Sequence, residues 1–139
     1  MATIILSNMG MDAPALSQYL AALAELRPEI ENPVLHLIYS PHNKDDINTA
    51  KRQEIARTLV KKLDLPEGWP VFVYWHGLRG KRKRQEPHFH IGLPLINDAG
   101  VRLPKPPSPF RVAQIAAEVE VECGLKVTRT FVSQGTKKN

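Results

Sequence analysis

The sequence predicts an α+β fold, in which helices cover an antiparallel sheet of five strands. Two observations carry this expectation. Strand-type and helix-type segments follow one another in the order β-α-β-α-β-β-α-β, and the third and fourth strands are consecutive, so a hairpin should join them. A chain of 139 residues is about one domain. We therefore expect a single domain over residues 1–133 and a disordered tail over 134–139.

The first half of the chain predicts two strands and two helices. A Thr-Ile-Ile-Leu run marks a strand over residues 2–6, and residues 34–40 form a second strand that Pro41 closes. Asp12 can cap the first helix, and Asn48 or Thr49 starts the second, which runs to residue 63 before Pro66 and Gly68. Apolar side chains recur at helical spacing in both: Leu16, Tyr19, Leu20, Leu23 and Leu26, then Ile55, Ala56, Leu59 and Leu63.

The second half predicts a hairpin, a helix and a last strand. Residues 71–76 are rich in β-branched and aromatic side chains, and a further strand covers residues 88–96 before a turn at 97–100. The proline-rich stretch 104–109 is a stiff connector. A helix over 109–123 then stops at Gly124, and the last strand covers residues 126–132.

Composition excludes several classes of protein. Hydrophobic residues make up 42% and charged residues 24%, as in ordinary globular domains, and no apolar run approaches the roughly 20 residues of a membrane span. The first ten residues lack the features of a secretory signal, so we expect a cytoplasmic protein without a membrane partner. The one cysteine, Cys123, permits no intrachain disulfide and is expected to be a small buried hydrophobe.

Positive charge is concentrated in the loop of the predicted hairpin. The formal net charge is only +5. The loop nevertheless carries a basic block of five side chains: Arg79, Lys81, Arg82, Lys83 and Arg84. Clustered cations displace the counterions that condense on nucleic acid, so the basic block favours DNA contact over a merely solvated loop.

Three histidines form a candidate metal site. His88 and His90 lie two residues apart on a strand, so both imidazoles project from the same face. His76 ends the preceding strand, and in a hairpin it would lie opposite the start of the next. Three imidazoles leave coordination positions open, as catalysis requires. We expect His36 to be half-buried without binding metal, and His42 to be a loop residue.

The segment around these histidines resembles the metal-binding region of relaxases, the mobilisation nucleases of the histidine-hydrophobe-histidine endonuclease class. The resemblance rests on Val-Tyr-Trp-His at 73–76, the basic loop, and Pro-His-Phe-His-Ile-Gly-Leu-Pro-Leu-Ile-Asn at 87–97 followed by Asp-Ala-Gly. The strand over 34–40 and the helix ending in Glu-Cys-Gly-Leu at 122–125 also look like their counterparts. The match covers about residues 33–128, and this chain is shorter than usual for the family.

The resemblance implies a mechanism and its partners. A divalent ion, Mn²⁺ or Mg²⁺, held by His76, His88 and His90 would polarise a phosphate of single-stranded DNA at a transfer or replication origin, and imidazole ligands favour Mn²⁺. A tyrosine would attack and leave a 5′-phosphotyrosine, in the mobilisation of a plasmid or mobile element, with accessory mobilisation proteins as further partners.

The nucleophile and its helpers stay open at this point. Relaxases place the tyrosine near the N-terminus, which indicates Tyr19, although Tyr19 also fits the apolar stripe of its helix. Tyr74 is the reserve and Tyr39 the poorest candidate. Glu86, Asp45 and Asp46 are the acidic candidates for orienting a histidine. Two other functions compete: a catalytically reduced relaxase-like DNA-binding module, and a replication initiator of the same endonuclease class.

Overall fold

The computed structural model describes residues 2–7, 12–42, 45–77, 87–126 and 132–134. Its elements follow the order β1-α1-β2-α2-β3-β4-α3-β5. The helices are α1 (Ala13–Leu26), α2 (Thr49–Leu63) and α3 (Pro109–Glu122). The strands are β1 (Ala2–Ser7), β2 (Val34–Tyr39), β3 (Phe72–His76), β4 (His88–Pro94) and β5 (Val132–Gln134). The expected α+β class with three helices is confirmed.

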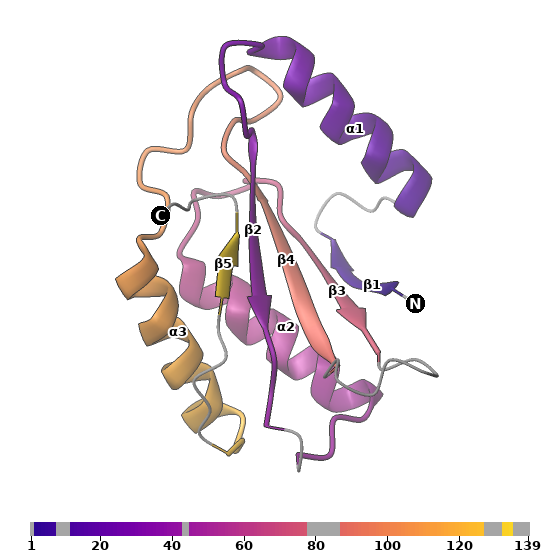
Figure 1. Ribbon diagram of the computed structural model, residues 1–139, viewed down its shortest axis with the longest axis vertical. Helices are drawn as coiled ribbons and strands as arrows, with labels where there is room; N and C mark the ends of the chain where they lie inside the picture. The colour runs from indigo at the N-terminus through magenta and orange to yellow at the C-terminus, as the bar shows by residue number, and fades with distance from the viewer. Residues whose placement is uncertain (1, 8–11, 43–44, 78–86, 127–131, 135–139) are drawn as a thin grey trace.

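The strands form one antiparallel sheet in the spatial order β1-β3-β4-β2-β5 (Figure 1). β3 and β4 are neighbours in the chain and in the sheet, which confirms the expected hairpin pairing. The long connections that carry α1, α2 and α3 place the other strands around this pair. β4 therefore lies in the middle of the sheet, with β3 on one side and β2 on the other.

One face of the sheet carries the main core. Side chains alternate along a strand, so every second residue of β2, β3 and β4 points to the same side. On this side the buried strand residues are Leu35, Leu37, Tyr39, Val73, Trp75, Phe89, Ile91 and Leu93, and Val71, directly before β3, belongs to the same cluster. They share one cluster with the buried faces of α2 and α3, such as Ile55, Leu59 and Val119. Both helices therefore cover the same face, and the opposite face is left for other side chains.

Helix starts follow the expected chemistry. Asp12 and Asn48 are the N-caps of α1 and α2, and their side chains accept the backbone N–H groups of Ala15 and Lys51 at 3.0 and 2.8 Å. Ser108 caps α3 in the same way. Gly124 follows the C-cap of α3 with φ +68°, the left-handed conformation that glycine adopts without strain. These caps confirm where the sequence places the three helix starts.

Several predicted boundaries and faces are wrong. β4 ends at Pro94 rather than residue 96. The N–H of Leu95 still donates to the carbonyl of Pro33, the residue opposite it, but Pro33 has no N–H to return, and the carbonyl of Leu95 accepts the N–H of Leu103 instead. The last strand includes residues 132–134 rather than 126–132: Lys126 is outside it, 127–131 lie outside the described residues, and Gln134, which we assigned to the tail, is in β5.

The apolar stripe of α1 is narrower than expected. Leu16 and Leu23, two turns apart, are its buried members, whereas Leu26 is 49% exposed and Tyr19 and Leu20 are half-buried. In the part of the chain that the structure covers, no helix is long and apolar enough to cross a membrane.

Candidate metal centre

Three histidines meet on the face of the sheet that α2 and α3 leave open. In the antiparallel pairing of β3 and β4, His76 lies directly opposite His88, and directly paired residues share a face. His90 is two residues further along β4 and points the same way. The ring centroid of His76 lies 5.1 Å from that of His88 and 5.8 Å from that of His90. The centroids of His88 and His90 are 4.7 Å apart. The register of one hairpin thus produces the cluster.

The nitrogen atoms of the cluster fit a divalent ion. One ring nitrogen from each histidine lies within 4.8 Å of the others, and the two Nε2 atoms of His88 and His90 are 2.9 Å apart. Metal–nitrogen bonds of about 2.0–2.1 Å at angles between 90° and 110° separate two ligand nitrogens by roughly 2.8–3.4 Å. The pair from His88 and His90 has this spacing, and a ring nitrogen of His76 lies within 4.8 Å of both. All three rings are half-buried, so a substrate can approach.

His90 has the electrostatics of a ligand. Burial lowers its pKa to about 4, and the neighbouring charges of His88, His76 and His36 act in the same direction. At neutral pH its imidazole is therefore uncharged and has a free lone pair. Metal binding needs that form, because a protonated imidazole has no lone pair to offer.

Aromatic side chains form the wall beside His90. Tyr74 lies directly opposite His90, and their rings stack with centroids 4.8 Å apart and planes 11° from parallel. Phe72, two residues before Tyr74, lies parallel to it within 6° at 6.1 Å. The ring of Phe72 covers Gly92, where a Cβ atom would lie 1.9 Å from the Phe72 Cζ. The sequence analysis missed this wall, although Phe72 and Tyr74 share parity with His76.

The other histidines lie outside the cluster. His36 pairs with Gly92 and is half-buried, as expected, and burial lowers its pKa. It is not part of the group whose nitrogens come together. His42 follows β2 in a loop and is half-buried, so its expected position is also confirmed.

The three tyrosines occupy three different environments. The Tyr19 hydroxyl donates to Asp98 Oδ1 at 2.5 Å, and burial followed by that carboxylate raises its pKa. Asp98 follows β4 at the end remote from His88, and about 13 Å of strand already separates His90 from Pro94. The structure therefore brings the three histidines together but holds the hydroxyl of Tyr19 elsewhere. Tyr39 is fully buried on the core face, where its hydroxyl donates to Glu120, and only Tyr74 lies beside the histidines.

A family model places these observations in context. The MobA/VirD2-like relaxase nuclease domain matches residues 2–125. The chain belongs to this relaxase family. Relaxases of this kind are nucleases that nick single-stranded DNA in mobilisation, generally with a metal ion. No match was found among curated proteins or among solved structures.

Other predicted parts of this relaxase domain lie away from the cluster or outside the described residues. The basic block, Arg79 and Lys81 to Arg84, falls within 78–86, as does Glu86, so all of them are outside the described ranges. Asp45 accepts the backbone N–H of Lys126 at 3.1 Å, and Asp46 is exposed. Of the acidic candidates, Asp45 and Asp46 are described, and the side-chain contacts seen for them do not include a histidine.

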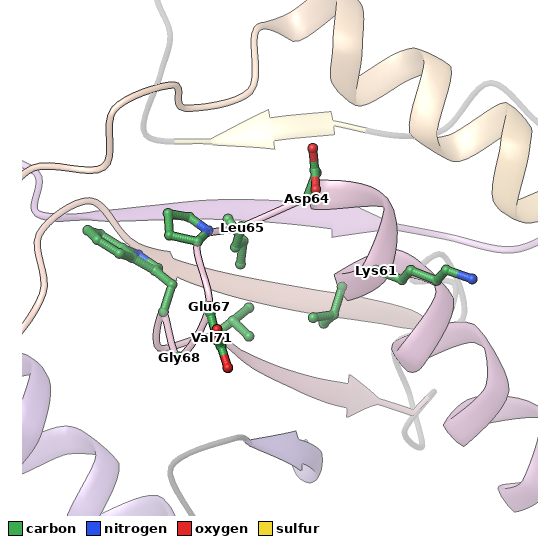
Figure 2. Close-up of a pocket in the computed structure, with 9 residues that line it drawn as sticks. Lys61, Asp64, Leu65, Glu67, Gly68 and Val71 are labelled. Atoms are coloured by element: carbon green, nitrogen blue, oxygen red, sulfur yellow. The ribbon is translucent and has the colours of Figure 1, made fainter.

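A cavity of about 280 Å³ lies at the opposite end of β3 from His76 (Figure 2). The last turn of α2 and the segment leading into β3 form its lining, which includes Lys61, Asp64 and Trp69. No histidine contributes to it. The open face around the histidines, rather than this cavity, therefore has the chemistry that a nuclease needs.

Proposed function

We propose that this protein nicks and rejoins single-stranded DNA with a divalent metal and a tyrosine nucleophile, in the mobilisation of a plasmid or mobile element. The observation that carries the proposal is the convergence of three imidazoles on one accessible face, within a chain that belongs to a relaxase family. A structural zinc site would be expected to have a fourth protein ligand, and among the residues that the structure describes the group holds three.

His76, His88 and His90 would hold the ion. A divalent cation bound there supplies Lewis-acid polarisation of a phosphate oxygen and a fixed point for orienting the strand. Either Mn²⁺ or Mg²⁺ serves in this role, and three nitrogen donors favour Mn²⁺, because Mg²⁺ prefers oxygen ligands. The low pKa of His90 keeps one ligand unprotonated at neutral pH.

Tyr19 is the proposed nucleophile. Its phenolic oxygen forms a bond to phosphorus while the bond from phosphorus to the 3′-oxygen breaks, the phenol loses its proton, and the 3′-oxygen leaves as a hydroxyl. This step requires the Tyr19 hydroxyl to leave Asp98 and reach the histidine face, because the phosphate must lie where the ion is. Tyr74 is the second candidate, since its ring already stacks on His90.

Phenylalanine variants distinguish these candidates. The chain is incubated with Mn²⁺ and a tiled pool of single-stranded oligonucleotides from the DNA flanking its gene, and DNA-linked protein is scored on a denaturing gel. We expect Tyr19→Phe to abolish the linked species and Tyr74→Phe to retain it, with Tyr39→Phe as a control on the buried face. The reverse result for Tyr19 and Tyr74 would assign the attack to Tyr74.

The metal ligands are tested separately. His88→Ala should abolish both Mn²⁺ binding and nicking while the fold is kept, and His42→Ala is the matched control, because His42 lies outside the cluster. A His88→Ala protein that still nicks at the wild-type rate would refute the proposed centre.

The basic block is proposed to hold the DNA backbone. Replacing Lys81, Arg82, Lys83 and Arg84 with glutamine should weaken single-strand binding and flatten its salt dependence, because fewer counterions are released. Binding without any linked species in the wild type would favour the alternative of a catalytically reduced DNA-binding module. A linked species formed at a replication origin would favour a replication initiator of the same class.

A further inference from the structure

We propose that Tyr74 is a positioning residue whose ring fixes the imidazole of His90 in its metal-binding orientation. This inference rests on the metal centre proposed above. It concerns how that centre is built from side chains which do not themselves bind the ion.

The register of the hairpin supplies the contact. The pairing that sets His76 against His88 also sets Tyr74 against His90 and Phe72 against Gly92. Directly opposed side chains in an antiparallel pair have neighbouring Cβ atoms, so the two rings meet without any bend of the backbone. Their planes are 11° from parallel, which is the offset-stacked arrangement that aromatic rings favour. One face of the His90 imidazole is therefore covered by a fixed plane.

The stack is supported from behind. Phe72 is 2% exposed, lies parallel to Tyr74, and leans across β4 into the space that Gly92 leaves open. A residue with a Cβ atom at position 92 would collide with this ring. Because Gly92 has no side chain, the ring of Phe72 can pack over it and beside the ring of Tyr74, where it limits the movement of Tyr74.

The support from Tyr74 matters because, among the described residues, the usual support of a metal-binding histidine is not seen at His90. A metal-binding histidine is ordinarily oriented by a hydrogen bond from its other ring nitrogen to a carboxylate, a carbonyl or water. Within the described ranges the one hydrogen bond of the His90 ring joins its Nε2 to His88 Nε2. That contact is given up when both nitrogens turn to a metal ion. The stacked ring of Tyr74 is then the contact that still defines the plane of His90.

The test compares Tyr74→Phe, which keeps the ring, with Tyr74→Leu, which removes it. Phe110→Leu is the matched control, because it also replaces an aromatic ring with leucine, at a residue of α3 that is 74% exposed and away from the site. Mn²⁺ affinity is measured by electron paramagnetic resonance of the free ion. We expect Tyr74→Leu to bind about tenfold more weakly, the lower end of the usual loss for an outer-shell partner, and the other two variants to bind like the wild type.

A second readout needs no metal. In the metal-free protein, the ring current of Tyr74 should shift the resonances of the carbon-bound protons of the His90 imidazole upfield. Proton–nitrogen correlation spectra of the histidine side chains measure these shifts. The shift should persist in Tyr74→Phe and disappear in Tyr74→Leu. Failure of the wild type to bind Mn²⁺ would overturn the proposed centre itself. Normal affinity in Tyr74→Leu, or a ring-current shift unchanged by that substitution, would overturn the positioning role of Tyr74 alone.

Discussion

Gly92→Ala tests the packing behind the histidines more directly than any other single substitution. The added Cβ would lie 1.9, 2.3 and 2.4 Å from the Phe72 Cζ, Cε2 and Cε1 atoms. Ordinary contact begins at 3.4 Å, so the ring must retreat by about 1.5 Å. Phe72 is almost fully buried and cannot move freely. Overpacking of this kind costs about 1–3 kcal/mol, and the entropy gained by replacing glycine returns only about 0.4–1 kcal/mol.

The assay is urea unfolding of four proteins: the wild type, Gly92→Ala, Phe72→Leu and the double variant. Leucine at position 72 lacks the ring atoms that collide. The double variant should therefore lose about 1 kcal/mol less stability than the two single variants lose together. Gly77→Ala is the matched control, because its added Cβ would meet its nearest atom, Trp75 Nε1, at an ordinary 3.5 Å. Equal stability of Gly92→Ala and Gly77→Ala, or strict additivity in the cycle, would refute the close approach of Phe72 to Gly92.

Three further outcomes follow from the structure. The pKa of His90 is about 4 in the folded protein, below its ordinary 6.5, so the unfolded chain takes up the proton first as the pH falls. The free energy of unfolding of the metal-free wild type should therefore decrease from pH 6.5 toward pH 4, and it should decrease less in His90→Gln. Urea unfolding at several pH values measures both. Ser108→Ala should cost about 1 kcal/mol in the same assay, because it removes the N-cap of α3. Ser108→Gly should cost only a few tenths, because glycine is itself a favoured N-cap residue. Tyr39→Phe should cost about 1–3 kcal/mol, since it removes the 3.2 Å hydrogen bond to the buried carboxylate of Glu120; an unchanged midpoint would mean that another donor compensates.

Local sequence chemistry was sufficient to predict much of the fold. The three helix starts follow from short polar side chains at Asp12, Asn48 and Ser108, whose effect reaches only three residues along the chain. The end of β4 could not be predicted in this way. Leu95 continues the apolar pattern of the strand, but the residue opposite it, Pro33, has no N–H to complete the pair and lies more than sixty residues earlier in the chain. A partner so distant in the sequence leaves no mark on the local pattern.

The candidate metal centre was predictable because it depends on parity and one hairpin register. His88 and His90 share a face in any strand, and pairing of consecutive strands brings His76 across to them. The same parity contained Tyr74 and Phe72, and the signal for their role was the glycine opposite Phe72 in a strand otherwise filled by larger side chains. The partner of Tyr19 could not be foreseen, because Asp98 lies 79 residues away in a turn whose position relative to α1 depends on the whole fold.

The position of Tyr19 connects the fold to the chemistry. Its hydroxyl donates to Asp98, while Arg27, the C-cap of α1, donates to the carbonyl of Gly100, so two hydrogen bonds attach α1 to the turn after β4. Burial, followed by the hydrogen bond that Asp98 accepts from the phenol, raises the pKa of Tyr19 and stabilises its protonated, unreactive form. Held in this way, the proposed nucleophile would be inert until DNA or a movement of α1 separates the pair. An attack by Tyr74 would need no such movement, so the phenylalanine variants also decide whether α1 must shift during nicking.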